Sequence, residues 1–589
     1  MGPVTDILNA IEEELRVEAA PVCFLVTDSR QEGQVWRLSV EPKDRKRGLD
    51  ESLEEAVAWW SGPPSGSAEV LSVIVDTDEI NIRHMKSLPP RKGQVLHIYK
   101  PTYLEALYDC WNDQEWAPRC EKAFEGIFQQ SIDLDDIPPV ENFPTLRAGQ
   151  RRAFGLLKRR YGFLWGPPGT GKTFTLGAML AQFLSERTNS RILLLSTTNA
   201  SVDLALIQVD KHLEVLSSKN AHASRTREDC KRIGMYFDPS EYRERKHLLP
   251  PVDKDLFRRW AELVARMPDP GDVYNYSDWK DKVKALRAGI SKPIDTARLA
   301  AMTTTGAAFS FEPLRKRMPY DLVVFDEASQ VSLAYALALM PLGKRVVFAG
   351  DDKQLAPIVQ SPHPLAKEWL GKSIFERKPK KGACFLDEQS RMEESICNVV
   401  SKVFYDGRLV VAQDCGTDAE WCRAREVPDV DPMGCKNVYL HNCDQVGQVS
   451  SKHDGHVRVP SADFVVTLVR RLLETTSANR ISILCPYRDQ RRFIHAALRR
   501  QKISNVKVST VHRAQGSECH TVIFDVVDAG HKFLNNDEDG PRLLNVALSR
   551  AMARLVIVYS SSDLQNVWLR RIVSQVDARN GVGDVYEPK

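Results

Sequence analysis

The 589-residue sequence lacks several features that mark whole classes of protein. None of its twelve cysteines forms a C-x-x-C pair, and its longest apolar run, Val331 to Gly343, is too short to cross a bilayer. The first residues include Asp6 and the acidic run 12–14, where a secretory signal would be basic and then apolar. We therefore expect a soluble, intracellular protein with reduced thiols and no membrane partner.

The sequence also has few cysteines and histidines at the spacing of metal ligands. The spacings in the densest group of cysteines and histidines do not match a zinc knuckle or a zinc ribbon. We interpret these side chains as free thiols and ordinary histidines rather than as a metal site. The group comprises Cys415, Cys422, Cys435, Cys443, His441 and His453.

A strong net charge is missing as well. The chain has 81 Lys and Arg against 78 Asp and Glu, a formal charge of +3, so affinity for nucleic acid must come from a local patch. Residues 211–298 carry 19 basic and 14 acidic side chains, a local excess of five. With 43% hydrophobic residues the composition is that of a globular protein, and the length predicts about four domains.

The N-terminal part alternates between helical and strand patterns. Apolar residues at helical spacing predict helices over 4–18 and 103–128. Between them, 21–99 holds short β-rich runs separated by turn residues, which predicts a small barrel. The runs are VCFLVT, QVWRLSV, EVLSVIVDT, EINIRHM and QVLHIYK. The acidic segment 131–145, with three prolines, is typical of a linker.

From residue 148 onward the pattern is strand followed by helix. Buried strands are expected in GFLW, RILLLS, RLAAMTTT, DLVVF and RVVFAG, and later in NVYL, ISILC, VKVST, HTVIFDVV and ARLVIVY. This alternation predicts two doubly wound parallel sheets. The apolar run at 331–343 is expected to be a core helix.

The most specific motif is GPPGTGKT, with an apolar run before it and a helical pattern after it. Its glycines allow successive backbone N–H groups to surround phosphate oxygens, and the helix adds its positive N-terminal end. Lys172 is expected to reach the β- and γ-phosphates, and the Thr173 hydroxyl to bind Mg²⁺. The expected nucleotide-binding residues here are Gly166, Pro167, Pro168, Gly169, Thr170, Gly171, Lys172 and Thr173.

A phosphate loop of this kind needs acidic partners on a neighbouring strand. DLVVFDEASQ is an apolar run that ends in Asp326, expected to hold Mg²⁺, and Glu327, expected to accept a proton from the attacking water. Gln354 in GDDKQLAP follows the next strand, and its amide can position water or sense the γ-phosphate. Arg391 and Arg550 carry the planar cation that suits phosphoryl transfer, although each alone is typical of a surface ion pair.

Together the motifs resemble those of the superfamily 1 helicases, and among these the up-frameshift, senataxin and immunoglobulin-mu-binding group. The resemblance extends from Leu146 to Tyr559. It is carried, in this order, by GPPGTGKT, DEASQ, GDDKQLAP, QSRM, AQGSE and NVALSRA.

The resemblance implies an α/β fold of two RecA-like P-loop domains with parallel sheets, a small N-terminal β-barrel accessory domain and a helical insertion. We assign the barrel with its stalk helices to 1–130 and the insertion to 211–298. The first RecA-like domain is assigned to 131–210 and 299–345, and the second to 346–589.

Several site residues are assigned only through this resemblance. Gln150 is expected to read adenine, and Gly516 and Glu518 to lie near the γ-phosphate and ribose. Arg391 and Arg550 are expected to be arginine fingers. Hydroxyls, amides and neighbouring side chains are expected to contact nucleic acid without reading its sequence. These residues are Thr198, Asn199, Thr304, Thr305, Pro486, Tyr487 and Thr510.

One position departs from the group. Where the group usually has a tyrosine that stacks on adenine, this sequence has Ser390. Base stacking contributes on the order of 1–3 kcal/mol, so the stacking must be lost, weakening nucleotide binding about tenfold or more, or be supplied by another side chain.

The expected function is an ATP- and Mg²⁺-dependent helicase or translocase that moves 5′ to 3′ on single-stranded DNA or RNA. The alternative is an ATP-gated clamp or remodeller with little unwinding, whose nucleotide site would look the same. A nuclease-coupled motor is disfavoured because no nuclease constellation is recognisable. We expect a monomer; the sequence names no protein partner and does not distinguish DNA from RNA, because no motif reports a 2′-OH contact.

Overall fold

The computed structural model describes residues 3–128, 142–249 and 292–580, with a few positions between 259 and 286. Short gaps within these ranges fall at 33–34, 44–48, 50–52, 54–55, 75–77, 84–87, 100–102, 219–220, 235–236, 238–239, 379–382, 445–447, 450–455 and 532. The chain divides into two compact units. The first contains residues 1–165, 172–351 and 356–385, and the second 166–171, 352–355 and 386–589.

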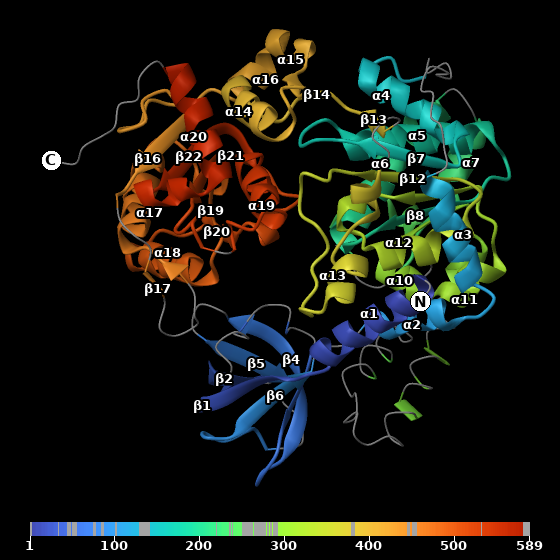
Figure 1. Ribbon diagram of the computed structural model, residues 1–589, viewed down its shortest axis with the longest axis horizontal. Helices are drawn as coiled ribbons and strands as arrows, with labels where there is room; N and C mark the ends of the chain where they lie inside the picture. Colours follow the sequence, from blue (N-terminus) through green and yellow to red (C-terminus); the bar gives the residue numbers. More distant parts are fainter. Residues whose placement is uncertain are drawn as a thin grey trace. The chain divides into compact units, whose positions relative to one another are not determined.

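The N-terminal strands close into a six-stranded barrel in the order β1-β2-β5-β4-β3-β6 (Figure 1). Alternate side chains such as Phe24 and Val26 are buried, because successive side chains of a strand face opposite sides. The strands are β1 (Val22–Glu32), β2 (Val35–Pro42), β3 (Val57–Trp60), β4 (Gly66–Ile74), β5 (Glu79–Arg83) and β6 (Val95–Tyr99). The predicted barrel is confirmed, although the sequence pattern missed β3.

Helices α1 (Pro3–Glu18), α2 (Leu104–Asn112) and α3 (Ala117–Phe128) belong to the same unit. Two buried tryptophans, one near the end of α2 and one just before α3, anchor these helices to α12 (Leu333–Leu339). The indole N–H of Trp111 donates to the Ala334 carbonyl at 3.1 Å, and that of Trp116 to the Ala338 carbonyl at 2.9 Å. Buried indole N–H groups need such partners, and the apolar run 331–343 forms the core helix that provides them.

The first unit contains a seven-stranded sheet in the order β13-β7-β12-β11-β8-β10-β9, and every adjacent pair is parallel. Its central strands are buried along their length, as expected when helices cover both faces. The strands are β7 (Tyr161–Trp165), β8 (Ile192–Ser196), β9 (Cys230–Arg232), β10 (Leu299–Thr303), β11 (Leu322–Phe325), β12 (Val346–Gly350) and β13 (Ala383–Phe385). The helices are α4 (Ala148–Ala153), α5 (Lys172–Glu186), α6 (Asn199–Ser217), α7 (Ala221–Glu228), α10 (Thr304–Phe309), α11 (Phe311–Lys316) and α13 (Pro364–Trp369).

The strands of this sheet extend past two of the domain limits that we expected from the sequence. We placed the start of the second RecA-like domain at 346, but β12 and β13 pair with β7. We placed the start of the insertion at 211, but α6 continues to Ser217 and β9 pairs with β10. Buried parallel strands have the same apolar sequence pattern in both sheets, so that pattern does not show which sheet a strand joins. Most of 250–291, and the linker expected at 131–145 up to 141, lie outside the described residues.

The second unit contains a five-stranded parallel sheet in the order β16-β22-β21-β19-β20 (Figure 1). Its strands are β16 (Val438–Asn442), β19 (Ile481–Cys485), β20 (Lys507–Thr510), β21 (Cys519–Asp525) and β22 (Ala551–Tyr559). Two short pairs join β14 (Glu388–Gln389) with β15 (Val410–Val411) and β17 (Gln448–Val449) with β18 (His456–Val457). The helices are α14 (Glu394–Phe404), α15 (Gln413–Thr417), α16 (Ala419–Arg423), α17 (Val459–Leu472), α18 (Arg488–Arg500), α19 (Asp539–Leu548) and α20 (Val567–Asn580).

The predicted α/β class with parallel sheets and an N-terminal barrel is therefore confirmed. Among the described residues, no helix combines the length and the hydrophobicity that a membrane crossing requires. In the same part of the chain, no three His, Cys, Asp or Glu side chains are grouped to hold a metal ion. His453, of the cysteine-rich group, lies outside the described residues.

Candidate functional site

The carboxyl edge of the first sheet brings four predicted residues together. Lys172 begins α5, and its Nζ lies 3.0 Å from Oε1 of Glu327. The Thr173 hydroxyl donates to Oδ2 of Asp326 at 3.0 Å. Strands β7 and β11 both border β12, so the loops after them meet at one edge. The predicted phosphate-binding lysine, hydroxyl and two acids thus form one constellation.

Burial and charge determine the protonation of this constellation. Burial raises the pKa of Asp326 to about 6, and the Lys172 ammonium opposes that shift. Burial acts to lower the pKa of Lys172, but Glu327, Asp326 and Asp351 outweigh it, and the net shift is upward. Lys172 therefore keeps its positive charge although it is almost fully buried.

Asp351 is a member of this site that the sequence reasoning missed. It is fully buried directly after β12, and its Oδ1 accepts a hydrogen bond from the Trp165 indole at 3.0 Å. Its carboxylate contributes to the raised pKa of Lys172. The signal was present, because Asp351 is the first acid of GDDKQLAP, but attention went to Gln354.

Glu327 has an unusual backbone conformation. Its φ of 52° lies in the left-handed region, which non-glycine residues seldom adopt. Its N–H donates to Oδ1 of Asp326 at 2.9 Å, and Gln330 donates to its Oε2 at 3.4 Å. Strained residues of this kind persist where the surroundings fix them, and they cluster at functional sites. Nothing in the sequence around Glu327 predicts this left-handed backbone conformation.

The loop before Lys172 fits a phosphate and a hard cation. Gly169 and Gly171 have φ angles of 76° and 73°, which suit glycine and turn backbone N–H groups in the manner of an anion-binding nest. The Thr173 hydroxyl and the Asp326 carboxylate are hard oxygen ligands of the kind Mg²⁺ prefers. The donor set therefore fits both groups.

Gln150 lies in α4, close to the start of the first α/β block. Its Oε1 accepts the backbone N–H of Arg147 at 3.0 Å, so the amide helps to cap the helix. The carbonyl of the preceding residue, Gly149, accepts a weak hydrogen bond from the Cys384 thiol of β13 at 3.6 Å. The side chain that we expected to read adenine is thus buried and held in place by its own helix.

Four predicted residues lie close together in the second unit, around the segment 516–518. The Arg391 guanidinium forms an ion pair with Glu518. Arg550 is buried and donates from Nη1 to the Ser517 carbonyl at 3.1 Å. Gly516 has a φ of 80° and open space where a side chain would project. The two predicted arginine fingers therefore converge on the segment 516–518, which we had expected to lie near γ-phosphate and ribose.

Gln354 is buried in the segment 352–355, which belongs to the second unit. Asn545 of the NVALSRA motif holds this segment, since its Nδ2 donates to the Lys353 carbonyl at 2.7 Å. The same amide contacts the Tyr405 hydroxyl at 2.8 Å. Asn545 is a positioning residue that the sequence reasoning did not single out, although it lies inside a recognised motif.

The backbone of Ser390 is held from both sides within the second unit. Its N–H donates to the Gly169 carbonyl at 3.0 Å, and its carbonyl accepts from the Trp421 indole at 2.6 Å. Arg425 also donates to that carbonyl at 2.8 Å and lies over the Trp421 ring, 4.0 Å from its centre. The aromatic side chain of Trp421 therefore lies beside Ser390, the position at which the resemblance led us to expect tyrosine.

The predicted nucleic-acid residues of the first unit follow two neighbouring strands. Thr198 and Asn199 follow β8, and Thr304 and Thr305 follow β10, with Ser196 and Thr303 paired in register. Thr198 caps α6 by accepting the Ser201 N–H at 3.2 Å. All four residues thus lie along the carboxyl edge of one sheet.

A buried ion pair underlies part of this edge. Nη2 of Arg232, at the end of β9, donates to Oδ1 of Asn199 at 2.7 Å, and its Nε lies 2.6 Å from Oδ1 of Asp203. The Tyr242 hydroxyl donates to the same carboxylate oxygen at 2.7 Å. Arg232 and Asp203 are both buried. Arg232 therefore orients Asn199, a role that its place in a charged stretch did not reveal.

The second unit places its predicted residues in the same way. Pro486 and Tyr487 follow β19, and Thr510 ends β20, where it pairs with Cys485. The Tyr487 hydroxyl donates to the Asp528 carbonyl at 2.9 Å. These three residues also meet at the carboxyl edge of their sheet.

Comparison with known proteins gives matches over both α/β regions. Two family models, each described as an AAA domain, match residues 150–360 and 370–562. A regulator of nonsense transcripts 1 homolog of Arabidopsis thaliana is 27% identical over 457 residues, which are 73% of this chain and 34% of that protein. The ATP-dependent helicase NAM7 of Saccharomyces cerevisiae is 25% identical over 548 residues, 87% of this chain and 54% of that protein.

The chain thus spans about a third to a half of the length of these two relatives. A crystal structure of the helicase arterivirus nonstructural protein 10 aligns with 95% of this chain and 82% of that chain. Its identity is 12% and its TM-score 0.39.

The Arg232–Asp203 pair yields a stability prediction. Arg232→Ala should lower the free energy of unfolding of the first unit by about 3–5 kcal/mol, because it leaves a buried carboxylate without its cation. The double variant Asp203→Asn, Arg232→Met should recover much of that loss. Urea unfolding followed by circular dichroism measures both. Arg83→Ala, which removes an exposed ion pair with Glu69, is the control, and an equal loss there would contradict the interpretation.

Proposed function

We propose that the chain is an ATP-dependent nucleic-acid helicase or translocase of superfamily 1, similar to the up-frameshift, senataxin and immunoglobulin-mu-binding group. The observation that carries the proposal is the constellation of Lys172, Thr173, Asp326 and Glu327 at one sheet edge. A positive charge, a hydroxyl and two acids at this spacing suit the hydrolysis of a nucleoside triphosphate.

Each residue of the constellation has a proposed role. Lys172 binds the β- and γ-phosphates of ATP and exchanges its contact with Glu327 for phosphate oxygens. Glu327, released from the lysine, accepts the proton of the attacking water. Thr173 and Asp326 would hold Mg²⁺, which when bound supplies charge neutralisation and orientation of the phosphates. Asp351 helps to keep Lys172 charged.

The second unit supplies the remaining proposed roles. Arg391 and Arg550 stabilise the charge that develops on the γ-phosphate, and Gln354 positions water. Gly516 and Glu518 lie near the γ-phosphate and ribose, and Gln150 of the first unit reads adenine. Arg391 donates to Glu518 through Nε, and under this proposal its Nη groups contact the γ-phosphate, since a guanidinium has five N–H donors and can contact two anions.

The proposed polymer partner is single-stranded DNA or RNA. Thr198, Asn199, Thr304 and Thr305 in one unit contact its backbone, and Pro486, Tyr487 and Thr510 do so in the other. Contacts of this type fix the strand without reading its sequence, as a motor requires. ATP binding and hydrolysis would alternately close and open the two units, which converts turnover into stepping.

Two substitutions test the nucleotide site. Lys172→Ala removes the phosphate-binding cation, and Glu327→Gln removes the proton acceptor while keeping the shape of the side chain. Each should lower strand-stimulated ATP hydrolysis at least about a hundredfold, measured by phosphate release. Lys344→Ala, which removes an exposed lysine paired with Asp321, should leave the rate unchanged. Retained turnover in Lys172→Ala or Glu327→Gln would refute the assigned role.

The alternative is an ATP-gated clamp or remodeller with little unwinding, which uses the same nucleotide chemistry. A duplex with a single-stranded tail separates the two functions. The helicase displaces the paired strand when it hydrolyses ATP. Strand-stimulated hydrolysis without any displaced strand would favour the clamp.

We further propose movement from 5′ to 3′. On end-labelled single strands the chain should displace streptavidin from a 3′ biotin and leave a 5′ biotin in place. The displacement is measured by gel shift with free biotin as a trap. Displacement from the 5′ end alone would overturn the proposed polarity.

Ser390 provides a prediction about nucleotide affinity. Ser390→Tyr should lower the dissociation constant for ATP about tenfold, because a stacking ring is worth on the order of 1–3 kcal/mol. Titration with a fluorescent ATP analogue measures the change, and Ser390→Ala is the matched control. Unchanged affinity in Ser390→Tyr, together with weaker binding in Trp421→Ala, would show instead that Trp421 already supplies the stacking ring.

A further inference from the structure

Five aromatic rings from four separate segments of the second unit contact one another in series, and we call them the ring array: His456, Tyr487, His512, His531 and Phe533. His456 stacks on Tyr487 with ring centres 4.8 Å apart and lies 4.2 Å from His531. Phe533 lies 5.7 Å from Tyr487 and 6.0 Å from His512. His456 begins β18, and the other rings follow the ends of β19, β20 and β21, which are neighbours in one parallel sheet.

The array runs from the interior to the surface. His456 and Tyr487 are buried, whereas His531 is exposed and Phe533 keeps 37% of its surface accessible. Burial stabilises the covered part of the Phe533 ring, whereas its exposed third is apolar surface that the fold itself does not cover. The outer end of the array therefore presents ring surface to solvent on top of a buried aromatic support.

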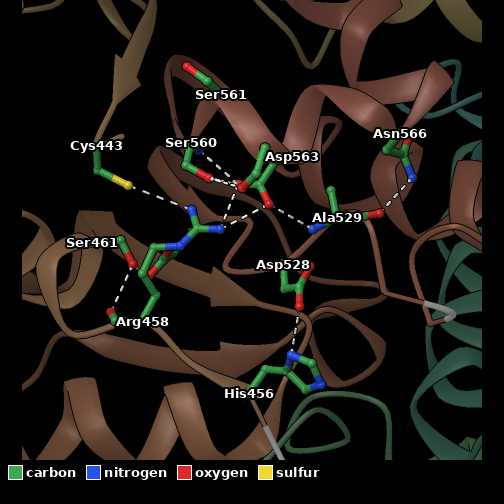
Figure 2. Close-up of polar contacts among 12 residues, drawn as sticks. Cys443, His456, Arg458, Ser461, Asp528, Ala529, Ser560, Ser561, Asp563 and Asn566 are labelled. Carbon is green, nitrogen blue, oxygen red and sulfur yellow. Dashed lines mark hydrogen bonds and ion pairs between the residues drawn. The ribbon is translucent and has the colours of Figure 1, made fainter. Parts of the chain in front are cut away.

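Hydrogen bonds fix the loop that carries the outer rings (Figure 2). Oδ1 of Asp563 accepts the Ala529 N–H at 2.9 Å, and Oδ2 of the same carboxylate lies 2.7 Å from Nη2 of Arg458. Both partners of that ion pair are fully buried. The Asn566 amide donates to the Leu534 carbonyl at 2.8 Å. The loop between β21 and α19 is thereby tied down on both sides of His531 and Phe533.

The inner rings are tied to the same loop. Nδ1 of His456 lies 2.8 Å from Oδ2 of Asp528 (Figure 2). The Tyr487 hydroxyl donates to the Asp528 carbonyl. Val527 adopts a φ of 64°, which is a genuine outlier for a β-branched residue. Such strain persists only where the surroundings over-determine it, and it marks functional loops. The ring array is therefore held in one arrangement before any ligand arrives.

The chemistry around the array suits a polyanion that carries flat rings. Arg488 and Arg513 are exposed, and each directly follows a member of the array in the sequence. Thr510 and Pro486, which we propose to contact the strand backbone, lie at the same sheet edge. Acidic groups are also near, since Asp528 and Asp539 face His456 and His512, so the array is not a plain basic patch.

We propose that Phe533 and His531 form a stacking platform for an unpaired nucleobase of the bound strand. This inference rests on the proposed function, because it names a contact that the strand would make. Base stacking on aromatic side chains tolerates any sequence, since every base has a flat face. The platform would hold one base while Thr510, at the same sheet edge, holds the backbone.

The test separates base contacts from backbone contacts. Full-length Phe533→Ala and His531→Ala are compared with the unchanged chain by fluorescence anisotropy on two labelled strands of equal length, oligothymidylate and the same strand with its central bases removed. Phe533→Ala should weaken binding to the complete strand about tenfold, and His531→Ala by less. Neither should weaken binding to the base-free strand as much. Phe533→Trp should retain the affinity, because it keeps a ring.

Val215→Ala, at an exposed apolar residue on α6, is the control for a general surface effect and should change neither affinity. Thermal melting of each variant shows whether it is folded. Equal losses on the two strands, or no loss on the complete strand, would overturn the platform. If the unchanged chain binds neither strand, the proposed function itself fails, which is a different result. Preserved hydrolysis without any strand in Phe533→Ala would further support a platform separate from the nucleotide site.

Discussion

The first unit depends on the neutralisation of buried charge at one sheet edge. A single ammonium, that of Lys172, lies among the carboxylates of Asp326, Glu327 and Asp351. Three acids this close would repel one another and lose their hydration unless a cation compensated them. The order of strands β7, β12 and β11 in one parallel sheet makes the compensation possible, because the loops after these strands end at the same edge. Fold and chemistry are therefore set by the same arrangement.

The second sheet repeats this arrangement with different groups. Tyr487, Thr510 and Asp528 follow β19, β20 and β21, which are neighbours in the sheet. Rings and hydroxyls occupy its edge where the first sheet has a lysine and acids. The two units thus share a construction rule, in which the sheet supplies rigid positions and the loops at its carboxyl edge supply the chemistry. The proposed nucleotide and strand contacts follow one rule because only the loop residues differ.

Short motifs were predictable from the sequence because their chemistry is local or comes from adjacent strands. GPPGTGKT and DEASQ identified Lys172 and Asp326, and alternating apolar runs identified the barrel. The domain limits expected at 211 and 346 differ from those in the structure, because the sequence of a buried strand does not show which sheet it joins. Strands β9 and β12 are the examples. The strand β3 was missed because four residues are too few for a clear alternation.

Other features were beyond the sequence because they depend on contacts between distant segments. Arg232 contacts Asp203, which is 29 residues away in the sequence, and Asn545 contacts Lys353, which is 192 residues away. The rings of the array come from segments between 456 and 533 that no pattern connects. The roles of the site residues named from the resemblance remain proposals, which the experiments above test one by one.

The first helix has a partner that the chain reaches only much later. Glu14 of α1 is buried, and its two carboxylate oxygens accept the backbone N–H groups of Gln360 and Ser361, 346 and 347 positions downstream. The Glu14 carboxylate therefore lacks both of these partners until residues 360 and 361 have been synthesised, although α1 also contacts the nearby α2, where the Tyr108 hydroxyl donates to Glu12. The final hydrogen bonds of this helix thus depend on a segment that is made much later in the same chain.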